Sequence, residues 1–238
     1  MNRRSFLKLS GTGVLSLYLA TRGGLLKQVF AAPIPGGTLD PLAVPKYQTP
    51  MLIPPVMPKA GQLKQKGGKP IDYYEISMKQ FSQQILPAGF GATPVWGYGS
   101  VNGSGSKRAL LLHNAPSLTI EADWQRPVRI KWINDLVDAN GNYLPHLLPV
   151  DPTLHWANPP GGAMGRDMRP EFTETPASYT GPVPMVTHVH GAVGVGDESD
   201  GYAEAWYLPA ANDIPAGFAT EGTWYDYFGG KALNGYGE

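Results

Sequence analysis

The chain has 238 residues, of which 19 are basic, 19 are acidic and none is cysteine. Without cysteine it has no disulfide bond, no thiolate zinc site and no cysteine nucleophile. Its 30 glycines and 24 prolines disfavour long helices, and with a hydrophobic fraction of 42% they are typical of an all-β sandwich or barrel.

Residues 1–32 are predicted to be an export signal. Residues 3–8 read Arg-Arg-Ser-Phe-Leu-Lys, which resembles the twin-arginine signal, and a mildly apolar run and the small pair Ala31-Ala32 follow. The run is too short and too polar to cross a bilayer, which takes about 20 apolar residues. We therefore expect a periplasmic or extracellular protein; a disordered basic N-terminus is the alternative. The twin-arginine route carries folded proteins, which suits a metalloprotein.

The charge balance changes once the signal is removed. Without residues 1–32, 14 basic and 19 acidic side chains remain, a net charge of −5. A mildly acidic chain without a run of Lys or Arg has no electrostatic footprint for nucleic acid or for an anionic membrane. We expect neither as a partner.

Residues 33–70 are rich in proline, which fixes φ and removes backbone donors. They are predicted to form an extended arm wrapped over the following domain; a polyproline ligand for a partner domain is the alternative. Strand patterning begins with Ile71–Lys79, whose alternation places Tyr74, Ile76 and Met78 on one face.

The next stretch, residues 89–105, is rich in glycine. No helix pattern and no closing Lys-Ser/Thr follows, so a phosphate-binding loop is rejected and Trp96-Gly97-Tyr98 is expected to serve packing. Residues 118–122 and 128–136 both alternate and flank a turn at 123–127, which predicts a hairpin. Its second strand would turn Val128, Ile130 and Trp132 inward.

Three of the five histidines have no ligand pattern. His146 and His155 are nine residues apart with prolines in and around the interval, so they do not share a strand face. His113 has no partner. We expect all three to be structural or exposed. Residues 161–179 are polar, contain Gly and Pro and lack periodicity, which predicts a surface loop.

The remaining two histidines form the pattern His188-Val189-His190, followed by Gly191. On a β-strand, alternate side chains share a face, so the predicted strand 186–191 would aim both imidazoles at one place. Imidazole is the commonest nitrogen ligand for copper and zinc. The pattern alone is a weak signal, and two structural histidines are the alternative.

A longer stretch strengthens the metal hypothesis. Thr187–Gly191, an acidic turn and the sequence Ser-Asp-Gly-Tyr-Ala-Glu-Ala-Trp-Tyr at 199–207 resemble the first copper-ligand segment of bacterial multicopper oxidases, in the branch of spore-coat laccases and bilirubin oxidases. Residues 143–158 also resemble this branch. The resemblance covers about residues 70–228 and implies that 71–238 form an all-β, cupredoxin-like Greek-key β-sandwich. Residues 115–118 depart from the family, which usually has Pro-Gly-Pro there.

The resemblance also implies roles for three residues. His188 would bind the type 2 copper and His190 one of the type 3 coppers of a trinuclear cluster, and Asp200 would assist proton delivery. The implied reaction oxidises phenols, bilins or metal ions and reduces dioxygen to water. Its blue copper requires a thiolate, which this chain lacks. A simple turn at Asp200-Gly201 is the alternative for the carboxylate.

The family pattern continues to a Trp-Tyr-His-Asp-His segment that does not occur before Glu238. We therefore expect the N-terminal portion of a longer oxidase, with an incomplete first domain and no turnover by itself. A stand-alone exported copper-binding domain is one alternative. A zinc hydrolase using His188, His190 and Asp200 is the other, although catalytic zinc usually has three protein ligands and an open position.

Overall fold

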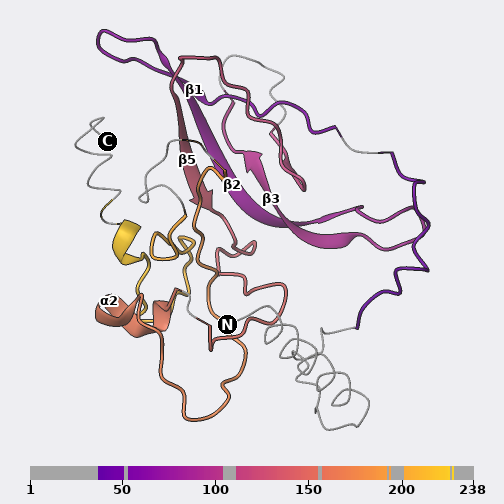
Figure 1. Cartoon of the computed structure of the whole chain (residues 1–238), viewed down its shortest axis with the longest axis vertical. Coiled ribbons are helices and arrows are strands. Elements are labelled where there is room, and N and C mark those ends of the chain that lie inside the picture. The colour runs from indigo at the N-terminus through magenta and orange to yellow at the C-terminus, as the bar shows by residue number, and fades with distance from the viewer. Residues whose placement is uncertain are drawn as a thin grey trace, which may run out of the picture. The chain divides into compact units, whose positions relative to one another are not determined.

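The computed structural model describes residues 37–50, 53–103, 111–154, 157–191, 193, 201–225 and 227. All but Gly37 and Thr38 belong to one compact unit, Leu39–Glu238. The described elements are mostly strands, as predicted, and Figure 1 shows them: β1 (Gly61–Leu63), β2 (Ile71–Gln83), β3 (Thr93–Ser100), β4 (His113–Asn114), β5 (Val128–Asn134), the 3-10 turn η1 (Pro159–Gly161) and the one-turn helix α2 (Gly162–Gly165).

The long strand β2 is the centre of the sheet. β1 pairs antiparallel with its beginning, with Gly61 opposite Tyr73, and β3 pairs antiparallel with the rest, with Trp96 opposite Gln80. β5 runs parallel along Asp72–Met78, so it occupies the other edge of β2. β4 pairs with β3 and extends the sheet by two residues.

The predicted alternation of β2 is confirmed at Tyr74 and Ile76, whereas Met78 is only half-buried and Ser77, on the opposite face, is buried. Tyr74 and Ile76 are fully buried, and with Met57 and Leu118 they form the first hydrophobic core. Val128, Ile130 and Trp132 of β5, which were predicted to face inward, pack against this cluster. Tyr98 of β3 and Leu112, just before β4, pack against it as well. Each fully buried large side chain contributes about 1.5–3 kcal/mol, so this face stabilises the sheet.

The predicted hairpin of residues 118–122 and 128–136 is wrong. β5 forms, but its partner is β2 in parallel register. The backbone of Thr119 instead bonds the proline-rich segment: Met57 N donates to Thr119 O at 2.8 Å, and Thr119 N donates to Pro55 O at 2.9 Å. Thr119 thus pairs with the proline-rich segment and not with β5.

Two glycines of β3 explain its glycine-rich sequence. A Cβ at Gly97 would overlap the backbone of Asn114, and a Cβ at Gly99 would overlap the backbone of Leu112 and the ring of His113. The close approach of β4 therefore requires glycine at both positions. This supports the structural interpretation of the stretch over a phosphate-binding loop.

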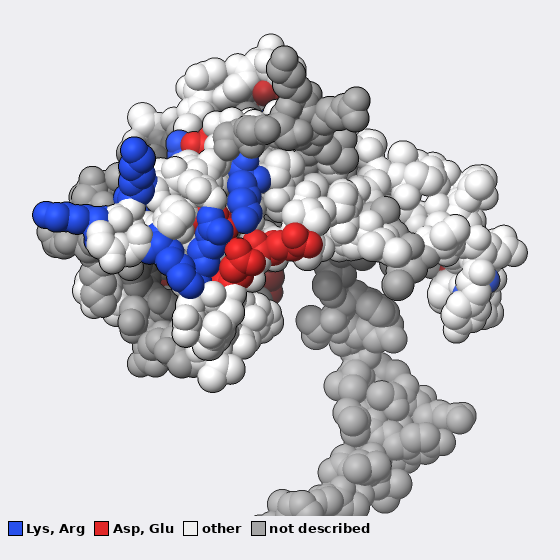
Figure 2. Space-filling model, turned by 90° about the horizontal axis from the view of Figure 1, so that it is seen from above, with Lys and Arg blue, Asp and Glu red and all other residues white. Residues whose placement is uncertain are grey.

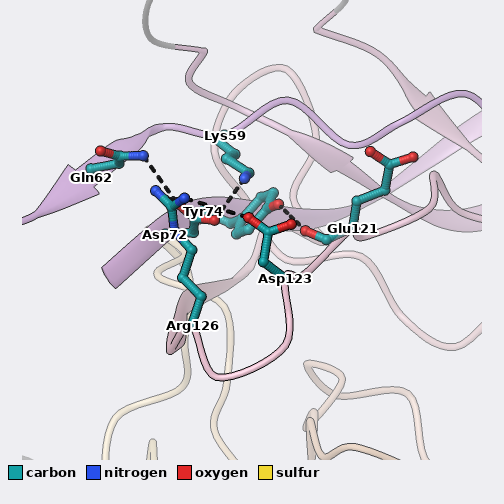
Figure 3. A network of polar contacts seen from close by, with 7 residues as sticks. All are labelled: Lys59, Gln62, Asp72, Tyr74, Glu121, Asp123 and Arg126. Carbon is teal, nitrogen blue, oxygen red and sulfur yellow. Dashed lines mark hydrogen bonds and ion pairs between the residues drawn. The ribbon is translucent and has the colours of Figure 1, made fainter. Parts of the chain in front are cut away.

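A buried carboxylate joins the proline-rich segment to the sheet, as Figure 3 shows. Asp72 has no exposed surface and accepts bonds from Lys59 at 2.6 Å, Gln62 at 3.2 Å and Arg126 at 2.9 Å. Lys59 and Gln62 belong to the segment predicted as an arm, whose residues 61–63 form β1. Arg126 lies in the turn before β5. The carboxylate thus holds three segments together.

A second core lies under the segments that carry the histidine pair. It consists of Ala157, Trp206, Leu208 and Ala219, with Val186 and Ile214 packed against it. Asn134, the last residue of β5, links the sheet to this region, since its Nδ2 donates to Val183 O at 2.8 Å and to Tyr207 O at 3.2 Å. The end of β5 therefore fixes the chain just before the histidines.

The charged surface is uneven. Figure 2 shows Lys and Arg side chains gathered on one part of one face, with Asp and Glu side chains at their edge. Ion pairs in the described part of the chain include Lys79–Asp135 at 3.0 Å and Arg126–Asp123 at 3.4 Å. Among the described residues, no helix has the length and apolarity that a membrane crossing requires.

Candidate metal centre

The histidine segment is anchored at its start by a backbone pair. Met185 and Tyr207 exchange two N–H···O bonds of 3.0 Å, and Tyr207 also bridges to Glu221. No strand continues from Met185 to Gly191, so the predicted strand 186–191 is wrong. The physical reason lies in the neighbouring segment, which curls into a turn where Ala205 N donates to Tyr202 O at 3.0 Å and offers no further ladder.

His188 and His190 nevertheless lie side by side. Their ring centroids are 5.7 Å apart, the ring planes are inclined by 49°, and both side chains are exposed. Imidazole nitrogens are common metal ligands, so two adjacent exposed rings make this segment the candidate metal centre. The pair is therefore adjacent without a β-strand, while its role as a metal ligand pair stays a prediction.

Gly201 supports the first of these rings. Its φ is +75°, and a Cβ there would lie 2.6 Å from Cε1 and Nδ1 of His188. The imidazole thus packs directly over the glycine backbone. The sequence indicated only a turn at Gly201, because this residue is 13 positions from His188 and its contact with the ring comes from the fold.

The described residues supply only part of a metal-binding set. Within them no three His, Cys, Asp or Glu side chains gather as a metal site. The arrangement fits a site that takes two imidazoles from this segment and its other ligands from elsewhere. Asp200, the predicted proton donor, lies outside the described residues, as does His155.

Tyr207 lies beneath this segment and is structural. Its Oη is 3.4 Å from Thr187 Oγ1, and its ring is 5.4 Å from that of Tyr225. Burial raises the pKa of Tyr207 to about 12, so the phenol stays protonated at neutral pH. Its position orients Thr187, the residue before His188, through side-chain contact.

Two other histidines are structural, as predicted. His113 Nε2 is 2.8 Å from Ser77 Oγ, and burial lowers its pKa. His146 packs between Trp96 at 5.8 Å and Tyr179 at 6.0 Å, and burial lowers its pKa as well. Both rings are therefore neutral near pH 7 and belong to the packing of the domain.

An open depression is lined by Thr153 and residues 169–175. Neither His188 nor His190 is among the described residues that line it.

Comparison with known proteins yields two similar sequences and no matching family model. The laccase of Bacillus subtilis (strain 168) is 29% identical over 169 residues, which are 70% of this chain and 24% of that protein. The laccase of Bacillus stratosphericus is 33% identical over 138 residues, 57% of this chain and 19% of that protein. This chain thus spans a quarter or less of the length of these relatives.

Proposed function

We propose, since this chain is a distant relative of the bacterial laccases, that residues 71–238 are the first cupredoxin-like domain of a copper-dependent oxidase. The proposed enzyme oxidises phenols, bilins or metal ions and reduces dioxygen to water. We assign this activity to an assembled enzyme that also contains the remaining laccase domains, because the similarity covers at most 24% of a relative's length.

The adjacency of His188 and His190 carries this proposal. The two exposed imidazoles, 5.7 Å between ring centroids, suit two copper ions a few ångströms apart rather than one closed site. His188 would hold the type 2 copper and His190 one of the type 3 coppers. Copper supplies the one-electron redox chemistry that dioxygen reduction requires. The chain's own contribution is to hold two imidazoles side by side, with the His188 ring packed against Gly201.

Asp200 is the proposed proton carrier. Four-electron reduction of dioxygen to water consumes four protons, and a carboxylate near the cluster supplies a group that binds and releases them. The proposal is supported by Gly201, the next residue in the chain, whose backbone contacts the His188 ring. Replacement of Asp200 by Asn in the assembled enzyme is expected to slow oxygen consumption more as the pH rises.

Export is the second part of the proposal. Residues 1–32, which lie outside the described residues, would direct the folded protein through the twin-arginine route. The absence of cysteine is compatible with an oxidising compartment. Changing Arg3 and Arg4 to Lys is expected to retain the protein in the cytoplasm, measured by fractionation.

The test of the copper proposal is a titration of the purified chain with Cu(II), followed by electron paramagnetic resonance. We expect nitrogen hyperfine structure that His188→Ala or His190→Ala removes and that His146→Ala, the loss of an imidazole elsewhere, leaves intact. Weak copper binding fits one half of an interdomain cluster. A tight mononuclear site favours a stand-alone copper-binding domain, and zinc-dependent hydrolysis that needs His188, His190 and Asp200 favours a hydrolase.

A further inference from the structure

The carboxylate of Asp167 connects three segments near the candidate metal centre. Its Oδ1 accepts a 2.7 Å bond from Nε1 of Trp206, and its Oδ2 accepts bonds from the backbone N and the hydroxyl of Thr223. Asp167 follows helix α2, and in Figure 1 this turn lies beside the yellow segment that contains Thr223. All three donors are neutral, so in these bonds the carboxylate acts as a hydrogen-bond acceptor.

The bond to Trp206 lies next to the backbone pair that anchors the histidine segment. Met185 pairs with Tyr207, and the fully buried ring of the preceding residue, Trp206, is held by Asp167. Five residues before Trp206, Gly201 contacts the ring of His188. The described stretch from Gly201 to Trp206 is thus the route by which Asp167 could influence the position of His188.

Asp167 itself lies in a turn that is held by hydrogen bonds. Nδ2 of Asn158 donates to Gly165 O and to Met168 O, both at 3.1 Å. The backbone N of Asn158 donates to Arg166 O at 2.8 Å. These bonds surround Asp167 on both sides in the sequence. The residue is thus presented by a turn whose backbone is already ordered.

We propose that Asp167 is a positioning residue for His188, acting through Trp206 and Gly201. The proposal rests on the proposed role of His188 as a copper ligand. Residues that orient metal ligands at one remove tune metal affinity without touching the metal. Nothing in the sequence pattern around Asp167 indicates this, because its partners are 39 and 56 residues away.

Asp167→Asn is the informative change because it keeps the shape and alters only the hydrogen bonding. The amide has one acceptor oxygen where the carboxylate has two. If this oxygen keeps the two donors of Thr223, the amide NH2 group faces the indole N–H of Trp206, and two donors oppose each other. The Trp206 bond is then lost. Trp206→Phe removes the same bond from the other side while keeping a ring in the core.

The experiment compares the metal-free full chain and its variants by NMR at pH 8, using the histidine Cε1–H signals assigned with His188→Ala. The matched control is Asp151→Asn, since Asp151 also accepts the backbone N and the hydroxyl of a threonine, Thr153, within another loop. We expect Asp167→Asn and Trp206→Phe to shift the His188 signal, with the His113 and His146 signals unchanged and the control silent. The Cu(II) affinity is expected to fall by roughly 3–10-fold, below the 10–100-fold typical of a direct partner of a ligand.

An unchanged His188 signal in Asp167→Asn would overturn the proposal, as would an equal shift in the Asp151 control. If Asp167→Asn does not fold, Trp206→Phe gives the same decision. If the unmodified chain binds no Cu(II), the proposed copper function fails, while the metal-free His188 signal still decides the role of Asp167.

Discussion

The ring of His188 lies against the backbone of Gly201, so close that a Cβ at residue 201 would come within 2.6 Å of the imidazole. This contact joins the candidate ligand to the residue that follows Asp200 in the chain. Glycine is therefore required at residue 201 by the contact with His188 as well as by the turn.

Gly201→Ala is expected to displace the His188 ring and weaken Cu(II) binding. The substitution also strains a backbone with φ of +75°, which costs roughly 1–2 kcal/mol for a residue with a Cβ. Gly217→Ala is the matched control, because Gly217 has φ of +86° and nothing within 4 Å of a built Cβ. Equal losses of copper affinity in both variants would show that strain, and not the contact with His188, is responsible.

His188→Ala or His190→Ala in the assembled oxidase is expected to abolish oxygen reduction. Blue-copper absorbance should stay near normal, because that copper needs a thiolate, which no residue of this chain supplies. An oxygen electrode and an absorption spectrum of the same preparation check both points. Retained oxygen consumption in either variant would contradict the assignment of that histidine as a copper ligand.

Asp72→Asn is expected to destabilise the domain by about 3–5 kcal/mol, the usual cost of breaking a buried ion pair. The change leaves Lys59 and Arg126 facing a neutral amide. The exposed pair Lys79–Asp135 is the control, and Lys79→Ala should cost only about 0–1 kcal/mol. Urea unfolding measures both; a cost below that of the control would show that the network does not stabilise the fold.

The same network predicts a pH dependence. Burial by itself raises the pKa of Asp72, but the hydrogen bond and charge of Lys59 and the charge of Arg126 outweigh it and hold this pKa below the usual 3.8. The contribution of Asp72 is therefore complete above pH 3.8 and is lost as the pH falls toward the lower folded-state value. The bond to Asp72 raises the pKa of Lys59 above 10.5, so its contribution is lost only above that pH. Unfolding at pH 3 and pH 7 should differ less in Asp72→Asn than in the unmodified chain.

Gly97→Ala is expected to destabilise the sheet by about 1–3 kcal/mol, since the new methyl group meets the backbone of Asn114. Gly91→Ala is the control, because nothing lies within 4 Å of a Cβ there, and its effect should stay within about 0.5 kcal/mol. Thermal unfolding followed by circular dichroism compares the two. A silent Gly97→Ala would mean that β4 does not pack against β3 in solution.

The sequence by itself determined what depends on neighbouring residues. Alternation in Ile71–Lys79 and in 128–136 identified β2 and β5 and their buried faces, because side chains alternate along any strand. The spacing of His188 and His190 likewise indicated two adjacent imidazoles. These features follow from the spacing of residues along the chain.

Only the tertiary structure decided which segments pair and which distant side chains meet. Backbone donors and acceptors are the same in every segment, so the alternation of residues 118–122 could not reveal that Thr119 bonds Met57 rather than β5. For the same reason the sequence predicted a strand at 186–191, where the partner segment turns away. Asp72 and Asp167 are ordinary acidic residues until the fold places their donors around them.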